Sequence, residues 1–221
     1  MMFPNWAKNI IFLLIYMISG LILVILIEGL SSGSDLTPLN NVVEQLVVHV
    51  RTPLLTTLMV WVTRMGSPFI VTCAALFIAV MLAVRGYAYE ATLFVVAIII
   101  TGLSLTVLKN VFQVVRPISD IYQTDGWSFP SGHATMATAF FFMLGYAFWG
   151  KLKTLRARTT LVVGSVFGIF LVCFSRIYLG AHWMLDIIGA LAVGMLSVSF
   201  TILIFNIFLE RNRSLRNRLN L

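Results

Sequence analysis

Long runs of apolar residues, separated by short polar stretches, recur along the whole chain. The runs are continuous rather than alternating, which is typical of helices that cross a hydrocarbon layer roughly 30 Å thick. Six runs are predicted to span a membrane, approximately at Ile10–Ile27, Phe69–Val84, Ala91–Val111, Ala134–Phe148, Thr159–Tyr178 and Leu185–Leu209. Several fall short of the roughly 20 residues that a full span needs, as expected for helices that begin or end at a recessed site. The pattern predicts an all-α, polytopic membrane protein with one domain over residues 1–221.

The segment between the first two apolar runs has a different pattern. Apolar residues recur there at intervals of three and four positions, with polar residues on the opposite face. Thr37-Pro38 suits the start of a helix, because threonine is a good N-cap and proline fits the first turn. Pro53 interrupts the pattern, which resumes over Leu54–Arg64. We expect a pair of amphipathic helices, too polar to span, that lies at the membrane surface or against the helix bundle.

Composition supports a membrane protein and changes how the charge is interpreted. Hydrophobic residues make up 60% of the chain, charged residues 10%, and the mean hydropathy is +0.99, whereas a soluble domain of this length needs far more polar surface. The net charge of +7 would suggest nucleic acid as the partner of a soluble protein. In a membrane protein it has a simpler cause, so neither a nucleic-acid partner nor an obligate protein partner is indicated.

That cause is an unequal division of Lys and Arg between the two sides of the predicted bundle. With both termini in the cytoplasm, the cytoplasmic side holds Lys8, Arg85, Lys151, Lys153, Arg156, Arg158, Arg211, Arg213, Arg216 and Arg218. The other side holds Arg51, Arg64, Lys109, Arg116 and Arg176. Acidic residues show the opposite bias, with Glu90 and Glu210 inside and Glu28, Asp35, Glu44, Asp120, Asp125 and Asp186 outside. By the positive-inside rule, we predict cytoplasmic termini and polar motifs on the extracytoplasmic face.

The first of three polar motifs is a pair of cations at the end of the third apolar run. Lys109 and Arg116 are seven residues apart, so a continuing helix would place them on nearly the same face. They can anchor the helix end among lipid headgroups, or they can hold an anion. Pro117 ends the helix and leads into a polar loop over Ile118–Phe129.

The second motif, Pro130-Ser131-Gly132-His133, opens the fourth apolar run. A helix start offers unpaired N–H groups and the positive end of the helix dipole, both of which suit an anion. Ser131 can cap the helix or donate its hydroxyl, and Gly132 lets the backbone approach a ligand closely. A lone histidine at the position of His133 would more often make a structural hydrogen bond, but the preceding Ser-Gly favours a place in the anion site.

The third motif is Ser175-Arg176 followed by His182 and Asp186. His182 and Asp186 are four residues apart and share one face of a helix. The carboxylate can accept a hydrogen bond from one ring nitrogen, fix the tautomer and raise the basicity of the other nitrogen. This is the orienting half of a catalytic triad, with histidine as the nucleophile. The alternative is a buried pair that only locks two turns of the helix.

Three further polar residues are given no role. His49 lies on the amphipathic segment without a visible partner. Asp120 and Asp125 would suggest Mg²⁺, but no close cluster of ligands accompanies them. We expect both to be solvated loop residues, and we predict neither a metal nor a cofactor.

In order and spacing, the three motifs resemble the signature of the type 2 phosphatidic acid phosphatase superfamily. The full pattern is Lys-x6-Arg-Pro, Pro-Ser-Gly-His and Ser-Arg-x5-His-x3-Asp, and no fixed position of this chain departs from it. The signature covers about the middle third of the sequence. The six expected spans and the outward-facing site resemble the family over the whole chain, and the size resembles its small bacterial members.

The resemblance implies metal-independent hydrolysis through a phosphohistidine. It assigns His182 as the nucleophile, Asp186 as its orienting group, and His133 as the group that protonates the leaving alcohol and later deprotonates water. The non-bridging phosphate oxygens would be held by Lys109, Arg116, Ser131, Gly132 and Arg176. Preorganised donors and three cations suit a phosphate dianion, and two histidines can exchange protons near neutral pH.

The implied function is removal of phosphate from a lipid at the outer face of a bacterial plasma membrane. Phosphatidylglycerophosphate and undecaprenyl diphosphate are the leading expected substrates, and phosphatidic acid is a further one. Two alternatives stay open. A lipid phosphotransferase would pass the phosphate from His182 to an alcohol instead of water, and an anion or lipid transporter would not need the pair of His182 and Asp186.

Overall fold

The computed structural model describes residues 5–32 and 37–211. Within these ranges it contains eight helices and no strand, so the predicted all-α class is confirmed. The helices are α1 (Asn5–Ser31), α2 (Thr37–His49), α3 (Pro53–Met65), α4 (Pro68–Val84), α5 (Ala88–Phe112), α6 (Gly132–Trp149), α7 (Leu155–Tyr178) and α8 (Met184–Arg211).

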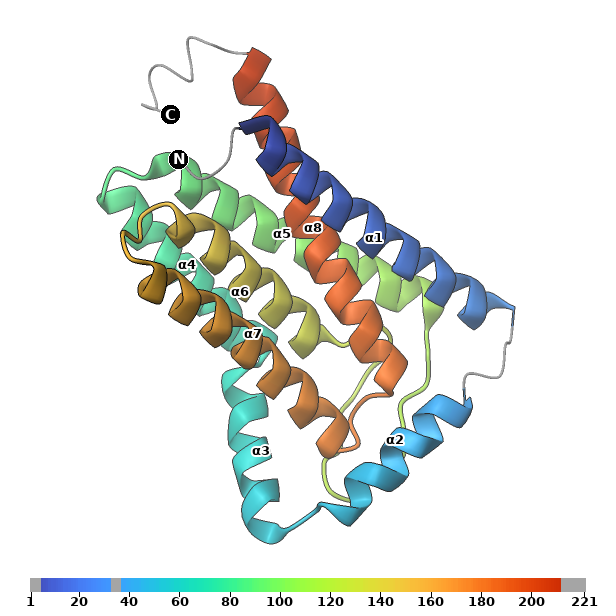
Figure 1. Cartoon of the computed structure of the whole chain (residues 1–221). Coiled ribbons are helices and arrows are strands. Elements are labelled where there is room, and N and C mark those ends of the chain that lie inside the picture. The colour runs from blue at the N-terminus through green and yellow to red at the C-terminus, as the bar shows by residue number, and fades with distance from the viewer. Residues whose placement is uncertain (1–4, 33–36, 212–221) are drawn as a thin grey trace.

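The bundle consists of helices that run up and down, namely α1, α4, α5, α6, α7 and α8 (Figure 1). Helix α6 occupies the middle and packs against α4, α5, α7 and α8, whereas α1 packs along α8 at the outside. The start of α1, the end of α8 and the turns α4–α5 and α6–α7 all lie at one end of the bundle (Figure 1). The segments that carry the three motifs meet at the opposite end.

All six predicted spans are helical, but the number of membrane crossings is confirmed only in part. Four helices, α1, α5, α7 and α8, are by themselves long and apolar enough to cross a membrane. Helices α3 and α4, bent by 50° at their junction, form a fifth crossing if they are counted together. The sixth crossing, by α6, stays a prediction. Helix α6 is surrounded by other helices and carries buried Thr135 and Thr138, whose hydroxyls donate to carbonyls four residues earlier, so it needs less apolar surface than a lipid-facing helix.

Small residues on α8 allow the close packing that positions the second motif. A Cβ atom at Gly189 would lie 2.4 Å from the ring of Phe129, and one at Gly194 would lie 2.8 Å from Cβ of Thr138. Larger residues at either position would therefore push α8 away from α6 and from the loop before it. Phe129 is fully buried, and its contact with α8 fixes the chain one residue before Pro130.

The expected amphipathic segment consists of the helices α2 and α3. Helix α2 begins at Thr37, as predicted, and Thr52 caps α3 by accepting a hydrogen bond from Leu55 N at 3.3 Å. The corner between them is tied to α7, because Arg51 Nε donates to Tyr178 O at 3.2 Å and Thr52 N donates to Tyr178 Oη at 3.1 Å. This corner holds α3 against the end of α7 that carries the third motif. Its position relative to a membrane remains a prediction.

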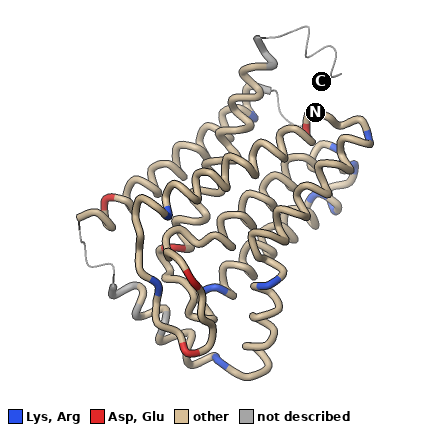
Figure 2. The backbone as a smooth tube through the Cα atoms, turned by 180° about the vertical axis from the view of Figure 1, so that it is seen from behind, with Lys and Arg blue, Asp and Glu red and all other residues tan. Residues whose placement is uncertain are grey.

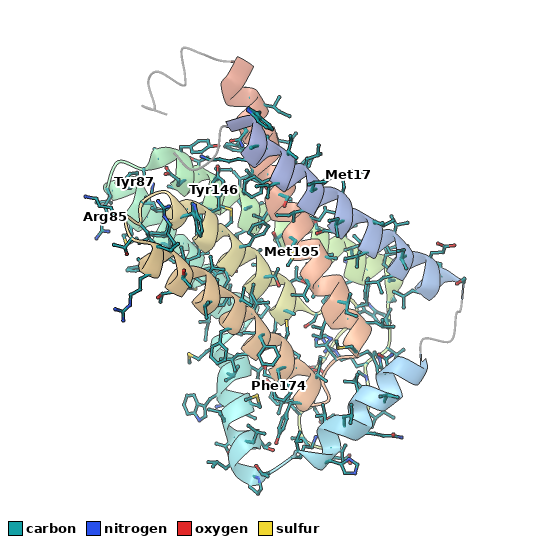
Figure 3. The ribbon with its side chains drawn as sticks, viewed as in Figure 1. Met17, Arg85, Tyr87, Tyr146, Phe174 and Met195 are labelled. Carbon is teal, nitrogen blue, oxygen red and sulfur yellow. The ribbon has the colours of Figure 1, made fainter. Side chains whose placement is uncertain are left out.

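The ends of the bundle differ in charge along the described chain. Figure 2 shows Lys and Arg positions at both ends of the bundle, and most acidic positions toward the end opposite the termini. Figure 3 places Arg85, Tyr87 and Tyr146 at the first end and Phe174 toward the second. Lys151 in the α6–α7 turn forms an ion pair with Glu90 of α5 and lies 3.6 Å from the centre of the Tyr87 ring. Asp35, Arg213, Arg216 and Arg218 lie outside the described residues, as do the side chains of Glu44, Glu210 and Arg211.

Candidate active site

The three motifs come from different helices but meet at one end of the bundle. Lys109 is in the last turn of α5, Ser131 precedes α6, and Arg176 is in the last turn of α7. Asp186 is in the first turn of α8, and Ser131 N donates to its backbone carbonyl at 3.2 Å. The starts of α6 and α8 are therefore joined directly, and the ends of α5 and α7 lie beside them.

Lys109 and Arg116 do not share a continuous helix, which corrects the sequence-based picture. Helix α5 ends at Phe112 because Gln113 adopts the left-handed conformation, with φ of 46°, four residues before Pro117. The two cations nevertheless meet, since Lys109 Nζ donates to the carbonyl of Trp127 at 2.5 Å and Arg116 Nη2 donates to the same oxygen at 3.3 Å. The α5–α6 loop, rather than a helix face, brings them together.

His182 and Asp186 form the expected pair, although His182 lies in the loop before α8 rather than on the helix. Nδ1 of His182 is 3.2 Å from Oδ2 of Asp186. The same carboxylate oxygen also accepts from Trp183 N at 2.9 Å. Both side chains are almost completely buried, with 1% and 2% of their surface exposed. The geometry fits the orienting role that the sequence assigns to the carboxylate.

Arg116 fixes the tautomer of this histidine. Its Nη1 lies 3.1 Å from His182 Nε2 and 2.8 Å from the carbonyl of Ala181. A guanidinium can only donate hydrogen bonds, so Nε2 accepts and Nδ1 carries the proton that is donated to Asp186. Burial lowers the pKa of His182 to about 4, opposed by the hydrogen bond and charge of Asp186 and reinforced by the charges of Arg176 and Arg116. The ring is therefore neutral at physiological pH and has its lone pair on Nε2.

Two buried polar atoms of the motifs have no hydrogen-bond partner among the described residues. They are Oγ of Ser131, which is fully buried, and Nε of Arg176, which is 1% exposed as a residue. Ser131 precedes the first residue of α6, yet its hydroxyl makes no capping hydrogen bond. Buried polar atoms are rarely left unpaired in proteins, so these two fit positions where oxygen atoms of a ligand bind.

The rest of Arg176 is held from two sides. Its Nη1 donates to Oγ1 of Thr63 on α3 at 2.7 Å, and its guanidinium carbon lies 5.4 Å from the centre of the Tyr122 ring. A hydrogen bond and an aromatic ring thus orient the guanidinium, while Nε has no partner among the described residues. The sequence analysis identifies neither Thr63 nor Tyr122, because no spacing rule links α3 or the α5–α6 loop to the end of α7.

His133 belongs to the same electrostatic cluster. It is partly buried in the first turn of α6. The charges of Arg176, Arg116 and Lys109 all act on its ring, as does His182. At Gly132, an added Cβ would meet Leu105 and Pro68 only at ordinary contact distances of 3.5 and 3.7 Å. Packing therefore does not demand a glycine there, and the expected close approach of a ligand to the backbone at Gly132 stays a prediction.

The residues that received no role are exposed, although the charge of Asp125 acts on the nearby Arg116. His49 is exposed, and its Nδ1 lies 2.6 Å from the carbonyl of Gln45 on the same helix. Asp120 and Asp125 are exposed in the α5–α6 loop, as expected of solvated residues. Within residues 5–32 and 37–211, no group of three or more His, Cys, Asp or Glu side chains is arranged to hold a metal ion.

The sequence analysis missed Ser128, whose side chain contacts the pair of His182 and Asp186. Ser128 is fully buried, although it lies in the loop that the sequence predicts to be polar. Its Oγ donates a hydrogen bond to Asp186 Oδ2 and lies 3.3 Å from His182 Nδ1. The only sequence signal is its position two residues before Pro130, and a serine there is unremarkable by itself.

Comparison with known proteins connects this geometry to a family. The family model described as the PAP2 superfamily matches residues 90–210, more than half of the chain and all three motifs. Phosphatidylglycerophosphatase B of Bacillus subtilis (strain 168) is 27% identical over 161 residues, which cover 71% of this chain and 78% of the relative. "Putative undecaprenyl-diphosphatase YbjG" of Escherichia coli (strain K12) is 39% identical over 69 residues, 31% of this chain and 30% of that protein.

A solved structure shares the fold. It is the crystal structure of a transmembrane PAP2-type phosphatidylglycerolphosphate phosphatase from Bacillus subtilis, with a TM-score of 0.74 and 22% sequence identity. The match covers 86% of this chain and 95% of that one. The arrangement of helices described above is therefore that of a membrane-embedded PAP2 protein.

Proposed function

The chain belongs to the PAP2 superfamily, and on that premise we propose that it is an integral membrane lipid phosphatase. It hydrolyses the terminal phosphate of phosphatidylglycerophosphate, of undecaprenyl diphosphate, or of both. The names of the Bacillus subtilis and Escherichia coli relatives support this choice of lipids. The reacting group is His182, through a phosphohistidine intermediate.

The observation that carries this proposal is the clamping of the His182 ring from both sides. Asp186 Oδ2 accepts a hydrogen bond from Nδ1 over 3.2 Å, and Arg116 Nη1 donates a hydrogen bond to the lone pair of Nε2 over 3.1 Å. A neutral imidazole whose Nε2 lone pair is directed at a cation is suited to attack an anionic phosphate that the cation binds. A pair that served only to lock the helix would not need a guanidinium at Nε2.

In the first step, the Nε2 lone pair forms a bond to phosphorus as the bond from phosphorus to the lipid oxygen breaks. His133, in its protonated form, donates its proton to that oxygen. The lipid then leaves, as an alcohol from phosphatidylglycerophosphate or as the monophosphate from undecaprenyl diphosphate. Asp186 stabilises the positive charge that develops on the ring of His182. In the second step, water attacks phosphorus, His133 takes up a proton from it, and the N–P bond breaks to release inorganic phosphate.

Residues of all three motifs hold the phosphoryl oxygens during both steps. Arg116 transfers its Nη1 hydrogen bond from His182 to an oxygen, and the unpaired Nε of Arg176 and hydroxyl of Ser131 donate to others. Lys109 adds a point charge, and the backbone at Gly132 approaches the phosphate at the positive end of α6. Transition-state charge on the oxygens then meets donors that are already oriented.

We further place the active site on the extracytoplasmic face of a bacterial plasma membrane, with both termini in the cytoplasm. Lys8, Arg85, Lys151 and Lys153 support this orientation, because they belong to the end of the bundle opposite the site. A lipid in the outer leaflet could then place its phosphate against the cations of the site while its acyl or prenyl chains stay among the helices.

Phosphate release from a panel of lipid phosphates, measured with purified protein in excess EDTA, tests the proposal. We expect release from phosphatidylglycerophosphate or undecaprenyl diphosphate that EDTA does not reduce, and none from the His182→Ala variant. Appearance of the phosphate on an added alcohol instead of in solution would assign a phosphotransferase. A requirement for Mg²⁺ that EDTA removes would point to Asp120 and Asp125 and contradict the histidine mechanism.

A further inference from the structure

Ser128 makes contacts that no part of the three-motif signature requires. Its hydroxyl donates to Asp186 Oδ2, and its Oγ lies 3.3 Å from His182 Nδ1. Its backbone is fixed as well, since Ser128 N donates to Val114 O at 2.7 Å. The side chain is fully buried, so these contacts are shielded from water.

The donors and acceptors around Ser128 can be assigned in one consistent way. Arg116 donates to Nε2, so the proton of the His182 ring is on Nδ1. Because a carboxylate only accepts, the Ser128 O–H donates to Asp186. The Nδ1 proton then lies between two acceptors, Asp186 Oδ2 at 3.2 Å and Ser128 Oγ at 3.3 Å. The hydroxyl thus touches both members of the pair at once.

The backbone just before Ser128 holds the cations. The carbonyl of Gly126 accepts from Arg116 Nε at 2.8 Å, and the carbonyl of Trp127 accepts from Lys109 and Arg116. The three consecutive residues 126–128 of the α5–α6 loop therefore contact both cations of the first motif and both members of the pair of His182 and Asp186. A nucleophile and an anion site that are held by the same short segment keep their relative positions.

A direct chemical role for Ser128 does not fit this geometry. Its oxygen is at the Nδ1 edge of His182, away from the Nε2 lone pair, and its proton is committed to Asp186. No base other than this pair contacts it within the described residues. Ser128 is therefore unsuited to attack phosphate.

We propose that Ser128 is a positioning residue that sets the ring plane and the basicity of His182. This inference rests on the proposed function, because it assumes that His182 reacts. Two acceptors at Nδ1 restrict rotation of the imidazole, so that Nε2 stays directed at the phosphate. The hydroxyl also shares the negative charge of the carboxylate, which weakens the tendency of the ring to become imidazolium.

Steady-state kinetics of Ser128→Ala, Ser128→Thr and Ser119→Ala test this role. Ser119 is the matched control, since it lies in the same loop and its hydroxyl donates to Leu179 O at 2.8 Å without touching the pair. Ser128→Ala should lower kcat by about tenfold to a hundredfold, the usual loss for an orienting partner, with KM nearly unchanged. Ser128→Thr, which keeps the hydroxyl, should restore most of kcat, and Ser119→Ala should leave it unchanged.

The pH profile separates positioning from mere packing. The charged or titratable groups that act on His182 are Asp186 from α8, Arg176 from α7, Arg116 from the α5–α6 loop and His133 from α6. All four remain in Ser128→Ala, but the carboxylate loses one donor and attracts the ring proton more strongly. The acid limb of kcat/KM should therefore move to higher pH in Ser128→Ala and stay in place in Ser119→Ala.

Wild-type kcat and an unmoved acid limb in Ser128→Ala would overturn the role of Ser128 alone. So would equal losses in Ser128→Ala and Ser119→Ala. Absence of His182-dependent phosphate release from the wild-type protein would instead overturn the proposed function. The ¹⁵N shifts of the His182 ring, recorded without substrate, should move toward the imidazolium form at higher pH in Ser128→Ala, and this readout needs no turnover.

Discussion

Nη1 of Arg116 donates a hydrogen bond of 3.1 Å to Nε2 of His182. The proposed reacting nitrogen is thus occupied, in the free protein, by a residue that the motifs assign to the phosphate. A bound phosphoryl group offers the guanidinium stronger, charge-assisted acceptors. Arrival of the substrate would therefore turn the arginine away from the ring and expose the lone pair at the moment when phosphorus is in place.

The acidic limb of the pH profile should lie well below the range that is usual for histidine. Burial lowers the pKa of His182 to about 4 from an ordinary 6.5, so Nε2 stays unprotonated down to that pH. We expect kcat/KM to fall as the pH drops through about 4, where protonation removes the lone pair. Measurement of kcat/KM from pH 3.5 to 8 checks this. A fall of kcat/KM on the acid side with a midpoint near pH 6.5 would contradict the prediction.

Replacement of Arg116 should move that limb. Its positive charge lowers the pKa of His182, so the uncharged Arg116→Gln protein should have a His182 that is protonated at higher pH. The acid limb of its residual activity should therefore lie at higher pH than that of the wild-type protein. An unchanged limb would show that Arg116 does not act on the ring.

His182 and Asp186 should differ in the severity of their loss. His182→Ala should abolish turnover, because no neighbouring side chain can replace a phosphate-accepting ring nitrogen. Asp186→Asn should keep some activity, with a rate about two to four orders of magnitude below that of the wild type, because the His182 ring remains but its tautomer is no longer held. Rates for both variants, measured on preparations whose folding is verified by thermal unfolding, check the prediction; wild-type rates in either would contradict it.

The three cations should act by geometry as well as by charge. Arg116→Lys and Arg176→Lys should each lower kcat/KM by on the order of ten- to a thousandfold, because a lysine cannot replace a guanidinium that binds two oxygens at once. Lys109→Arg should be milder, since a point charge is kept. Vanadate or tungstate should inhibit competitively, and their inhibition constants should rise in the same variants. Unchanged oxyanion binding in all three would assign the cations to lipid headgroups.

The three motifs predicted which residues lie close together, whereas the hydrophobic runs predicted a number of membrane crossings that is confirmed only in part. His182 and Asp186 meet although His182 lies in the loop just before α8, because Asp186 is in the first turn of that helix. Ser131 and Gly132 lie at a helix start, directly after Pro130. The pairing of Lys109 with Arg116 was right for a different reason than the one given. A left-handed Gln113 ends the helix, and glutamine at that position carries no sequence signal for such a turn.

What the sequence could not predict depends on contacts between distant segments. Thr63 meets Arg176 and Ser128 meets Asp186 only because α3 and the α5–α6 loop fold over the ends of α7 and α8. Hydrophobic runs predict where helices occur, but whether α6 crosses a membrane depends on how much of it other helices cover. The central position of α6 allows threonine and alanine where a lipid-facing helix would need larger apolar residues.

Topology is open to a direct test with reporters. After Arg218, a reporter enzyme that works only in the cytoplasm should be active. Near Gln123, which is exposed in the α5–α6 loop, a reporter enzyme that works only outside the cytoplasm should be active. The expectation follows from the cations at the end of the bundle opposite the site. The reverse pattern would place the site at the inner leaflet and change the lipids that it meets.

Trapping of the covalent intermediate tests the central claim most directly. The protein would be mixed with ³²P-labelled lipid phosphate, quenched in alkali, which preserves phosphohistidine, and digested for mass spectrometry. We predict phosphate on the peptide that contains His182, attached at Nε2, with none in His182→Ala and slower decay in His133→Ala. Rapid turnover of the wild-type protein with no phosphate on His182, or with phosphate on another residue, would contradict the account.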